Sequence, residues 1–323
     1  MFQITVGVDI AKKKFDIALL IENKYKHKHF SNDEAGFEAF IAWLLTFNLL
    51  TQPLICMEAT GAYSLPLADF LVAKGYSVSL VNPAKINAFA KSELSRTKTD
   101  KADAKLIARY ALAMQPGLWT PPPLEMRRLQ ALTRRLEHLL EIQQMERNRL
   151  ETADDSVIAS ITTLLKTVED EIKTIRQAIN DLINNNPDLD KRRELLESIP
   201  GIGAATIAHL LIAFSPHQGF TNAKQVVAFA GLAPALRQSG QWSGKTRIAK
   251  NGDPILRKVL YMPALCAWKH NPIIHDFCNR LKANGKNGKA IACAAMRKLI
   301  HIAFGVLKSG EPFDPLWAHS NKP

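Results

Sequence analysis

Cysteine is scarce in this chain of 323 residues, which holds four cysteines and no CxxC pair. This spacing argues against both a disulfide framework and a zinc site. No stretch reaches ~18 uninterrupted apolar residues, so we expect no membrane-spanning helix. The N-terminus, "MFQITVGVDIAKKKFDIALL", has lysines where a signal peptide has its apolar core, so no signal peptide is expected. These absences predict a protein of the reducing cytoplasm.

Acidic residues are nearly missing from one long segment. Between residues 236 and 310, fourteen Lys and Arg accompany only two acids, Asp253 and Asp276. The segment therefore carries a charge of +12, which equals the net charge of the whole chain. Basic charge concentrated in this way indicates a polyanionic partner. We expect nucleic acid to bind here, with an anionic membrane as the weaker alternative.

Three regions differ in their hydrophobic pattern, and we place them at residues 1–119, 120–188 and 189–323. In the first, "ITVGVDI", "FDIALLI", "PLICMEA" and "SVSLVN" predict strands, whereas "FEAFIAWLLTF" and "LPLADFLVAKGY" predict helices. The resulting β-β-α-β-α-β order indicates a mixed α/β sheet. Three prolines at 121–123 then break the chain, and the third region is predicted to be mainly helical.

The middle region is predicted to be a helical hairpin. Its first half is helical in pattern from about residue 124, and "ETADDS" separates it from a second half that ends near residue 184. Apolar residues of the second half recur with 3-4 spacing, namely Ile158, Ile161, Leu165, Val168, Ile172, Ile175, Ile179 and Leu182. This spacing is typical of a coiled-coil seam, which needs a partner and so predicts a homo-oligomer. Two ordinary core helices are the alternative.

Four acids of the first region are candidates for a metal site. Asp9 and Glu58 each end an apolar strand. Asp100 and Asp103 lie three residues apart in a predicted helix, so both carboxylates share one face. Clustered carboxylates suit Mg²⁺ or Mn²⁺, and two such ions can promote phosphodiester cleavage. Taken singly, each acid could instead cap a turn or a helix N-terminus.

The third region opens with "SIPGIGAATIAHLL", which predicts a helix-hairpin-helix. Backbone N–H groups at Gly201 and Gly203, beside the N-terminus of the second helix, can bind a DNA phosphate without reading its sequence. A tight turn between two core helices is the alternative.

A basic loop, "RQSGQWSGKTRIAKNG", places Ser239 and Ser243 among four cations and no acid. Such a serine can be a turn residue, a phosphate-binding hydroxyl or a nucleophile, and the loop alone leaves this open. Cations in and after the loop are expected to contact phosphates, which adds affinity and salt dependence. They are Arg237, Lys245, Arg247, Lys250, Arg257 and Lys258.

The order of the four acids, together with "MEATGAY", "KTDKADA", "IPGIG" and "FAGLAP" followed by "QSG", resembles the IS110 (IS one-ten) family of bacterial insertion-sequence transposases. The resemblance covers nearly the full length. It implies a RuvC-like, RNase H-fold domain whose DEDD site is Asp9, Glu58, Asp100 and Asp103, then a coiled coil and a C-terminal transposase domain. It also implies that Ser239 is the nucleophile that joins to DNA, with Ser243 as the second choice.

The same resemblance implies partners. A structured noncoding bridge RNA would pair with target and donor DNA, while the protein binds the shape of the RNA. We therefore expect an RNA-guided DNA recombinase that acts in the bacterial cytoplasm, at the nucleoid when bound to DNA. Two alternatives remain from the residues: a metal-dependent nuclease of the Holliday-junction resolvase type that uses water, and a non-catalytic nucleic-acid-binding protein.

Overall fold

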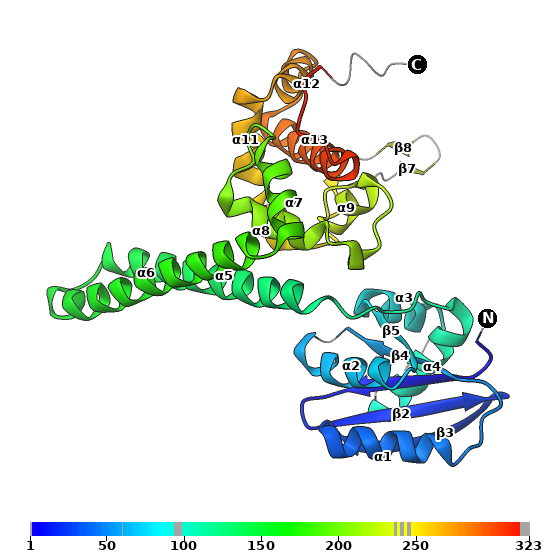
Figure 1. Cartoon of the computed structure of the whole chain (residues 1–323). Coiled ribbons are helices and arrows are strands. Elements are labelled where there is room, and N and C mark those ends of the chain that lie inside the picture. The colour runs from blue at the N-terminus through cyan, green and yellow to red at the C-terminus, as the bar shows by residue number, and fades with distance from the viewer. Residues whose placement is uncertain are drawn as a thin grey trace. The chain divides into compact units, whose positions relative to one another are not determined.

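The computed structural model describes residues 2–59, 61–93, 99–235, 238–239, 242–243 and 247–316, with side chains except at 238–239 and 242–243. The chain forms two compact units, Met1–Pro121 and Pro122–Pro323, which are shown in Figure 1. Each unit has its own hydrophobic core.

The N-terminal unit is built on a five-stranded mixed sheet. Its elements are β1 (Thr5–Ile10), β2 (Lys14–Ile21), β3 (Lys24–Ser31), α1 (Glu34–Leu45), β4 (Leu54–Glu58), the 3₁₀ turn η1 (Gly61–Tyr63), α2 (Leu65–Ala73), β5 (Ser77–Val81), α3 (Pro83–Ser92) and α4 (Asp100–Met114). The strand order is β3-β2-β1-β4-β5. Strands β1 to β3 pair antiparallel, whereas β4 and β5 run parallel to β1. The expected mixed sheet with helices is confirmed.

Strand β3 corrects the predicted order, which lacked a third strand before the first helix. Its residues alternate lysine with Tyr25, His27 and His29, and only Phe30 is buried, so the strand shows almost no apolar alternation. The two residues that join it to β2, Glu22 and Asn23, have positive φ of 45° and 64°. Such a turn suits a two-residue hairpin, but it lacks the usual Asn-Gly signal.

The sheet buries a separate core on each face, because successive strand residues point to opposite sides. One face of β1, with Val6, Val8 and Ile10, packs with residues of α1 and α2. The other face carries Thr5, Gly7 and Asp9 and is covered by α4. The Oγ1 of Thr5 donates to the carbonyl of Ala108 at 2.9 Å.

Gly7 decides how closely α4 approaches the sheet. A Cβ at this position would lie 2.1 Å from the carbonyl oxygen of Ala104 and 2.3 Å from the amide nitrogen of Ala108. Both are backbone atoms of α4, so no side chain can fit between the strand and the helix. The first turn of α4, with Asp100 and Asp103, is thereby brought over the sheet face that carries Asp9.

The C-terminal unit is mostly helical, as expected. Its elements are α5 (Leu124–Leu150), α6 (Asp155–Asn184), α7 (Pro187–Glu197), α8 (Ala204–Ala213), the 3₁₀ turn η2 (Pro216–Gln218), α9 (Ala223–Phe229), β6 (Pro234–Ala235), β7 (Gln238–Ser239), β8 (Trp242–Ser243), β9 (Arg247–Ile248), α10 (Pro254–Val259), α11 (Tyr261–His270), α12 (Pro272–Ala283) and α13 (Gly288–Ser309). Helix α13 is long and apolar enough to cross a membrane by length and composition alone. Eight of its residues are buried, and the helix forms part of the core of this unit.

Helices α5 and α6 form the predicted hairpin, and Figure 1 shows them lying side by side. The apolar seam of α6 packs against α5 of the same chain: Val168 and Ile172 are buried together with Leu139. Nearer the distal tip, Val157, Ile158 and Leu164 are exposed. Within the described residues, the buried part of the seam therefore has its partner in its own chain.

Helices α7 and α8 meet in the turn predicted as a helix-hairpin-helix. Gly201 has a φ of +107°, and a Cβ there would lie 2.6 Å from the Cβ of Ala267 in α11. A glycine is thus required by both backbone conformation and close packing. Gly203 is exposed at the N-cap of α8, and no side chain caps that helix.

Candidate active site

The predicted acids Asp9 and Glu58 lie side by side at the ends of two parallel strands. The pairing of Val8 with Met57 places the next residue of each strand, Asp9 and Glu58, at the same edge of the sheet. Both side chains are half-buried. Because alternate residues share a face, Asp9 follows Gly7 toward α4, and Glu58 follows Cys56, which belongs to the core under α4.

The other two acids, Asp100 and Asp103, are both in the first turn of α4. Thr99 caps this helix, since its Oγ1 accepts a hydrogen bond from the amide of Ala102 at 3.2 Å. Carboxylates in a first helical turn are stabilised by the free N–H groups and the helix dipole. That local role and a role in a shared site are compatible, because the helix N-terminus faces the sheet end.

The electrostatics of Asp9 report how close these acids lie. Burial, followed in decreasing order by the negative charges of Asp103, Asp100, Glu58 and Asp16, raises the pKa of Asp9 to about 6. Like charges shift a pKa in this way only at short range. The structure therefore brings the four predicted acids into one electrostatic cluster on the α4 face.

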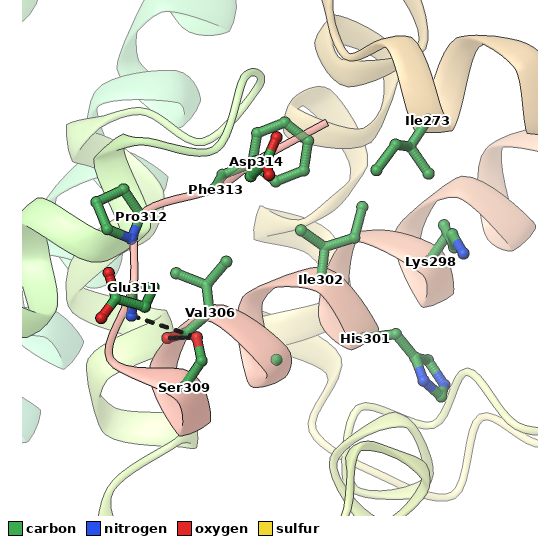
Figure 2. Close-up of a pocket in the computed structure, with 11 residues that line it drawn as sticks. Ile273, Lys298, His301, Ile302, Val306, Ser309, Glu311, Pro312, Phe313 and Asp314 are labelled. Atoms are coloured by element: carbon green, nitrogen blue, oxygen red, sulfur yellow. Dashed lines mark hydrogen bonds between the residues drawn. The ribbon is translucent and has the colours of Figure 1, made fainter. Parts of the chain in front are cut away.

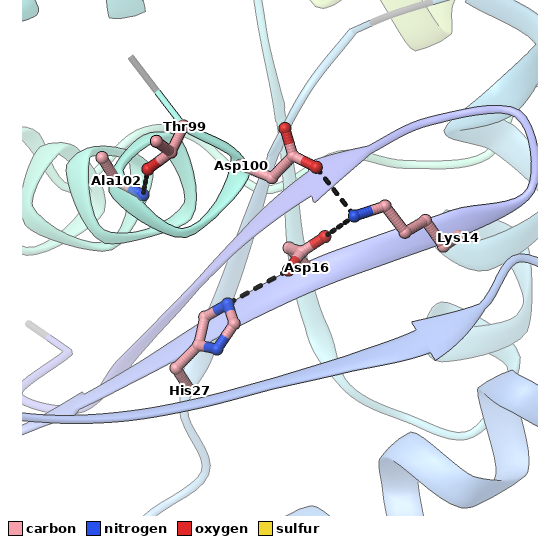
Figure 3. Close-up of polar contacts among 6 residues, drawn as sticks. All are labelled: Lys14, Asp16, His27, Thr99, Asp100 and Ala102. Carbon is pink, nitrogen blue, oxygen red and sulfur yellow. Dashed lines mark hydrogen bonds and ion pairs between the residues drawn. The ribbon is translucent and has the colours of Figure 1, made fainter. Parts of the chain in front are cut away.

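A fifth carboxylate, Asp16, belongs to this cluster and was missed in the sequence. It pairs directly with Asp9 across β1 and β2, and it is only 6% exposed. Its oxygens contact the Nζ of Lys14 at 3.0 Å and the Nε2 of His27 at 3.1 Å, as Figure 3 shows. The sequence did offer a sign of this residue, because Asp16 is the one acid inside the apolar stretch "FDIALLI".

The four acids suit a hard divalent cation in donor type, because each offers carboxylate oxygens. The raised pKa of Asp9 reflects its burial first and the nearby acids second, while Lys14 already pairs with two acids of the cluster, Asp16 and Asp100. Among the described residues, however, no three His, Cys, Asp or Glu side chains stand close enough together to hold an ion without some movement. The cluster thus fits a divalent metal in the chemistry of its donors, and its described side chains do not form a ready coordination site.

The serine loop lies in the other unit and is described at its base. Strand β6 pairs with β9, and the amide of Lys250 donates to the carbonyl of Gly231 at 3.0 Å. Within the loop, Ser239 pairs with Trp242 and Ser243 pairs with Gln238. The backbone is therefore a two-stranded antiparallel ribbon, and the two serines belong to different cross-strand pairs of residues.

The predicted phosphate-binding cations differ in their surroundings. Arg237 and Lys245 lie outside the described residues. Arg247 and Lys250 are exposed, whereas the Nη1 of Arg257 donates to the carbonyl of Ala230 at 3.1 Å. Lys258 joins the hairpin to α10, because its Nζ lies 3.2 Å from the buried carboxylate of Glu137.

A pocket of about 510 Å³ lies in the C-terminal unit between α12, α13 and the segment that follows α13 (Figure 2). Its walls include Ile302, Val306 and Phe313, with Lys298 and His301 toward one end. None of the predicted site residues lines it. It also holds no nucleophile paired with a base, so we assign it no part in the chemistry.

Comparison with known proteins decides the family. A transposase family model matches residues 6–153, and the model described as "Transposase IS116/IS110/IS902 family" matches residues 193–279. The pilin gene-inverting proteins of Moraxella bovis and Moraxella lacunata are each 37% identical to this chain, over 96% of it and 97% of their own length. The chain belongs to the IS110 family of transposases.

A more distant relative of this IS110-family transposase has the same extent. The transposase for insertion sequence element IS1328 of Yersinia enterocolitica is 25% identical, over 95% of this chain and 98% of its own length. The acid cluster lies within the first matched segment and the serine loop within the second. The protein is therefore an enzyme of DNA transposition and recombination, and DNA is its partner.

Proposed function

We propose that this transposase cuts and rejoins DNA through a covalent serine intermediate, using Asp9, Glu58, Asp100 and Asp103 with Ser239. The observation that carries the proposal is the electrostatic cluster around Asp9, whose pKa of about 6 reflects burial and its acidic neighbours. Acids with a raised pKa that share one sheet face are typical of functional sites. A RuvC-like fold for the N-terminal unit accords with its five-stranded mixed sheet.

The four carboxylates would hold Mg²⁺ or Mn²⁺. When bound, such ions supply activation of an attacking oxygen and stabilisation of a leaving oxygen. The protein's part is to present the carboxylates from rigid elements, namely the ends of β1 and β4 and the first turn of α4. The close packing of α4 on Gly7 fixes the position of the helix relative to the strands.

The serine step conserves the energy of the phosphodiester. The Oγ of Ser239 attacks the phosphorus, a P–O bond of the DNA breaks, and the serine proton is lost as the leaving oxygen gains one. A DNA hydroxyl then attacks the phosphoserine, breaks the P–Oγ bond and restores the serine. No ATP is required. Exposed cations beside the loop, Arg247 and Lys250, would offset charge on the phosphoryl oxygens.

We further propose that a noncoding bridge RNA selects target and donor DNA. The chain has no recognisable zinc finger or homeodomain to read bases, whereas its basic segment suits backbone contacts. Backbone contacts carry no sequence information, so base pairing by an RNA would have to supply it. Phosphate binding at Gly203, exposed at the N-cap of α8, would belong to the same surface.

Association through the hairpin is also proposed, and it gives a prediction. Val157, Ile158 and Leu164 are exposed apolar residues near the tip of α6, and a second copy would bury them. Replacing Ile158 and Leu164 by aspartate should convert the oligomer to a monomer in light scattering. The control is Val168→Ala, which weakens packing against α5 but leaves the tip unchanged. An unaltered oligomer mass in the aspartate variant would refute this interface.

A second candidate function is inversion of a DNA segment. The 37%-identical relatives are named for inverting a pilin gene, whereas the relative of Yersinia enterocolitica is named as a transposase. Both outcomes use the same cutting and rejoining, and they differ in the orientation of the recombining sites. A plasmid that carries the sites in inverted repeat would separate them, because inversion then changes its restriction pattern without loss of DNA.

The direct test uses purified protein, the RNA co-expressed from its element, Mg²⁺ and a labelled duplex with the element's junction. Asp9→Asn is expected to lower strand cleavage by about 10³-fold, because the cluster loses a metal-binding charge. Chelation of the metal should abolish cleavage, and added Mn²⁺ should restore it. Glu38→Gln, which breaks an exposed ion pair with Lys74 in the same unit, is the control. Unchanged cleavage in Asp9→Asn, or in the absence of metal, would overturn the proposal.

A further inference from the structure

The five carboxylates of the cluster repel one another, and a cation, the Lys14 ammonium, lies among them. The Nζ of Lys14 is 2.8 Å from the Oδ2 of Asp100 and 3.0 Å from the Oδ2 of Asp16. Figure 3 shows this ammonium bridging β2 and the first turn of α4. A lysine ammonium is protonated at neutral pH at its ordinary pKa, so the bridge carries a positive charge among the acids.

The sheet holds the Lys14 ammonium in place through Asp16. Asp16 is 6% exposed, and its second oxygen, Oδ1, lies 3.1 Å from the Nε2 of His27 on β3. Each oxygen of Asp16 thus has a fixed partner. Lys14 and Asp16 are two residues apart on β2, so both lie on the same face of the strand. The ammonium is therefore held on β2 by an acid that β3 holds in turn, although the Lys14 side chain is 49% exposed.

Asp100, by contrast, contacts the sheet through its ion pair with Lys14. It is the first residue of α4, and its side chain is 58% exposed. The cap at Thr99 satisfies the backbone of Ala102 and does not restrain the Asp100 carboxylate. The close packing of α4 on β1 starts one turn later, at Ala104. The contact with Lys14 is what ties the Asp100 carboxylate to the sheet.

The geometry points to Lys14 as a positioning residue of the active site: anchored by Asp16, which His27 contacts in turn, it holds the Oδ2 of Asp100 over the sheet face that carries Asp9, from where the Asp100 carboxylate would take part in binding a divalent cation. The inference rests on the proposed metal site. Hydrogen-bonded partners of metal-binding carboxylates act in this way, because they fix the rotamer before the metal arrives. Lys14 and Asp16 have no role in coordination itself.

The test measures Mn²⁺ affinity of the purified full-length protein by calorimetry, without DNA or RNA. Lys14→Met is expected to weaken Mn²⁺ binding by about 10- to 100-fold, in the range found for such outer partners. Asp16→Asn should weaken it similarly, because its amide cannot anchor the ammonium. Lys14→Arg should restore most of the affinity. An equal or tighter affinity of Lys14→Met would overturn the inference, since Lys14 would then be a bystander or a competitor of the metal.

Two controls separate the possible failures. Lys74→Met removes an exposed lysine of the same unit that forms a 2.9 Å ion pair with Glu38 and is likewise 49% exposed, so it should leave Mn²⁺ affinity unchanged. Thermal melting in chelator should be the same for Lys14→Met and wild type, which excludes unfolding as the cause. If wild type binds Mn²⁺ and Asp9→Asn does not, the metal site stands whatever Lys14 does. Absence of binding by wild type would overturn both.

Discussion

Ser239→Ala is expected to abolish the covalent protein–DNA adduct, whereas Ser243→Ala should retain it. Removal of a nucleophile typically lowers turnover by 10³-fold or more, because no other group takes its place. The two serines belong to different cross-strand pairs of the β7–β8 ribbon: Ser239 lies opposite Trp242, and Ser243 lies opposite Gln238. The backbone therefore places the two serines at different positions, so one cannot replace the other as nucleophile. The two variants should differ sharply in the amount of covalent adduct.

The measurement is a labelled DNA band that stays with the protein after boiling in detergent. Wild type, Ser239→Ala, Ser243→Ala and Asp9→Asn are compared with the RNA, Mg²⁺ and the junction duplex. An adduct lost in Ser239→Ala and kept in Ser243→Ala identifies the nucleophile. Free cleaved ends without an adduct, undiminished in Ser239→Ala, would instead support a nuclease that uses water. The reverse pattern would assign the reaction to Ser243.

Gly7→Ala is expected to destabilise the N-terminal unit by about 3 kcal/mol, at the upper end of overpacking effects. The added Cβ would lie 2.1 Å and 2.3 Å from backbone atoms of α4, so the helix has to move. Because Asp100 and Asp103 are in the first turn of that helix, Mn²⁺ affinity and DNA cleavage should fall as well. Chemical unfolding measures the loss of stability, calorimetry measures the Mn²⁺ affinity, and the labelled duplex measures DNA cleavage.

Gly117→Ala is the matched control for this experiment. It is also in the N-terminal unit, and a Cβ there would have no atom within 4 Å. The control should unfold and bind Mn²⁺ like wild type. If Gly7→Ala did the same, α4 would not owe its position to the close approach at β1, and the account of how the acids are brought together would be wrong.

Much of the candidate site could be predicted because its signals are local. Strand ends at Asp9 and Glu58 follow from short apolar runs, and the shared helix face of Asp100 and Asp103 follows from their spacing. The hairpin of α5 and α6 followed from apolar periodicity, and the basic segment from composition. Each of these depends on residues close together in the chain, so no tertiary contact was needed to infer it.

Other features depended on contacts between distant residues. Strand β3 has little apolar alternation, and it exists because its backbone pairs with β2. The partner of the α6 seam is α5 of the same chain, although the same periodicity would suit a second copy. Gly201 is needed for close packing on Ala267, which lies far along the sequence.

The sequence by itself determined the family, the order of the acids and the location of the positive charge, because motifs and composition are properties of the chain alone. Only the tertiary structure decided that Asp16 stands beside Asp9 and that Lys14 joins Asp16 to Asp100. Strand register and the packing of α4 on Gly7 set those distances. They arise from the balance of many non-local contacts, which no single stretch of sequence specifies.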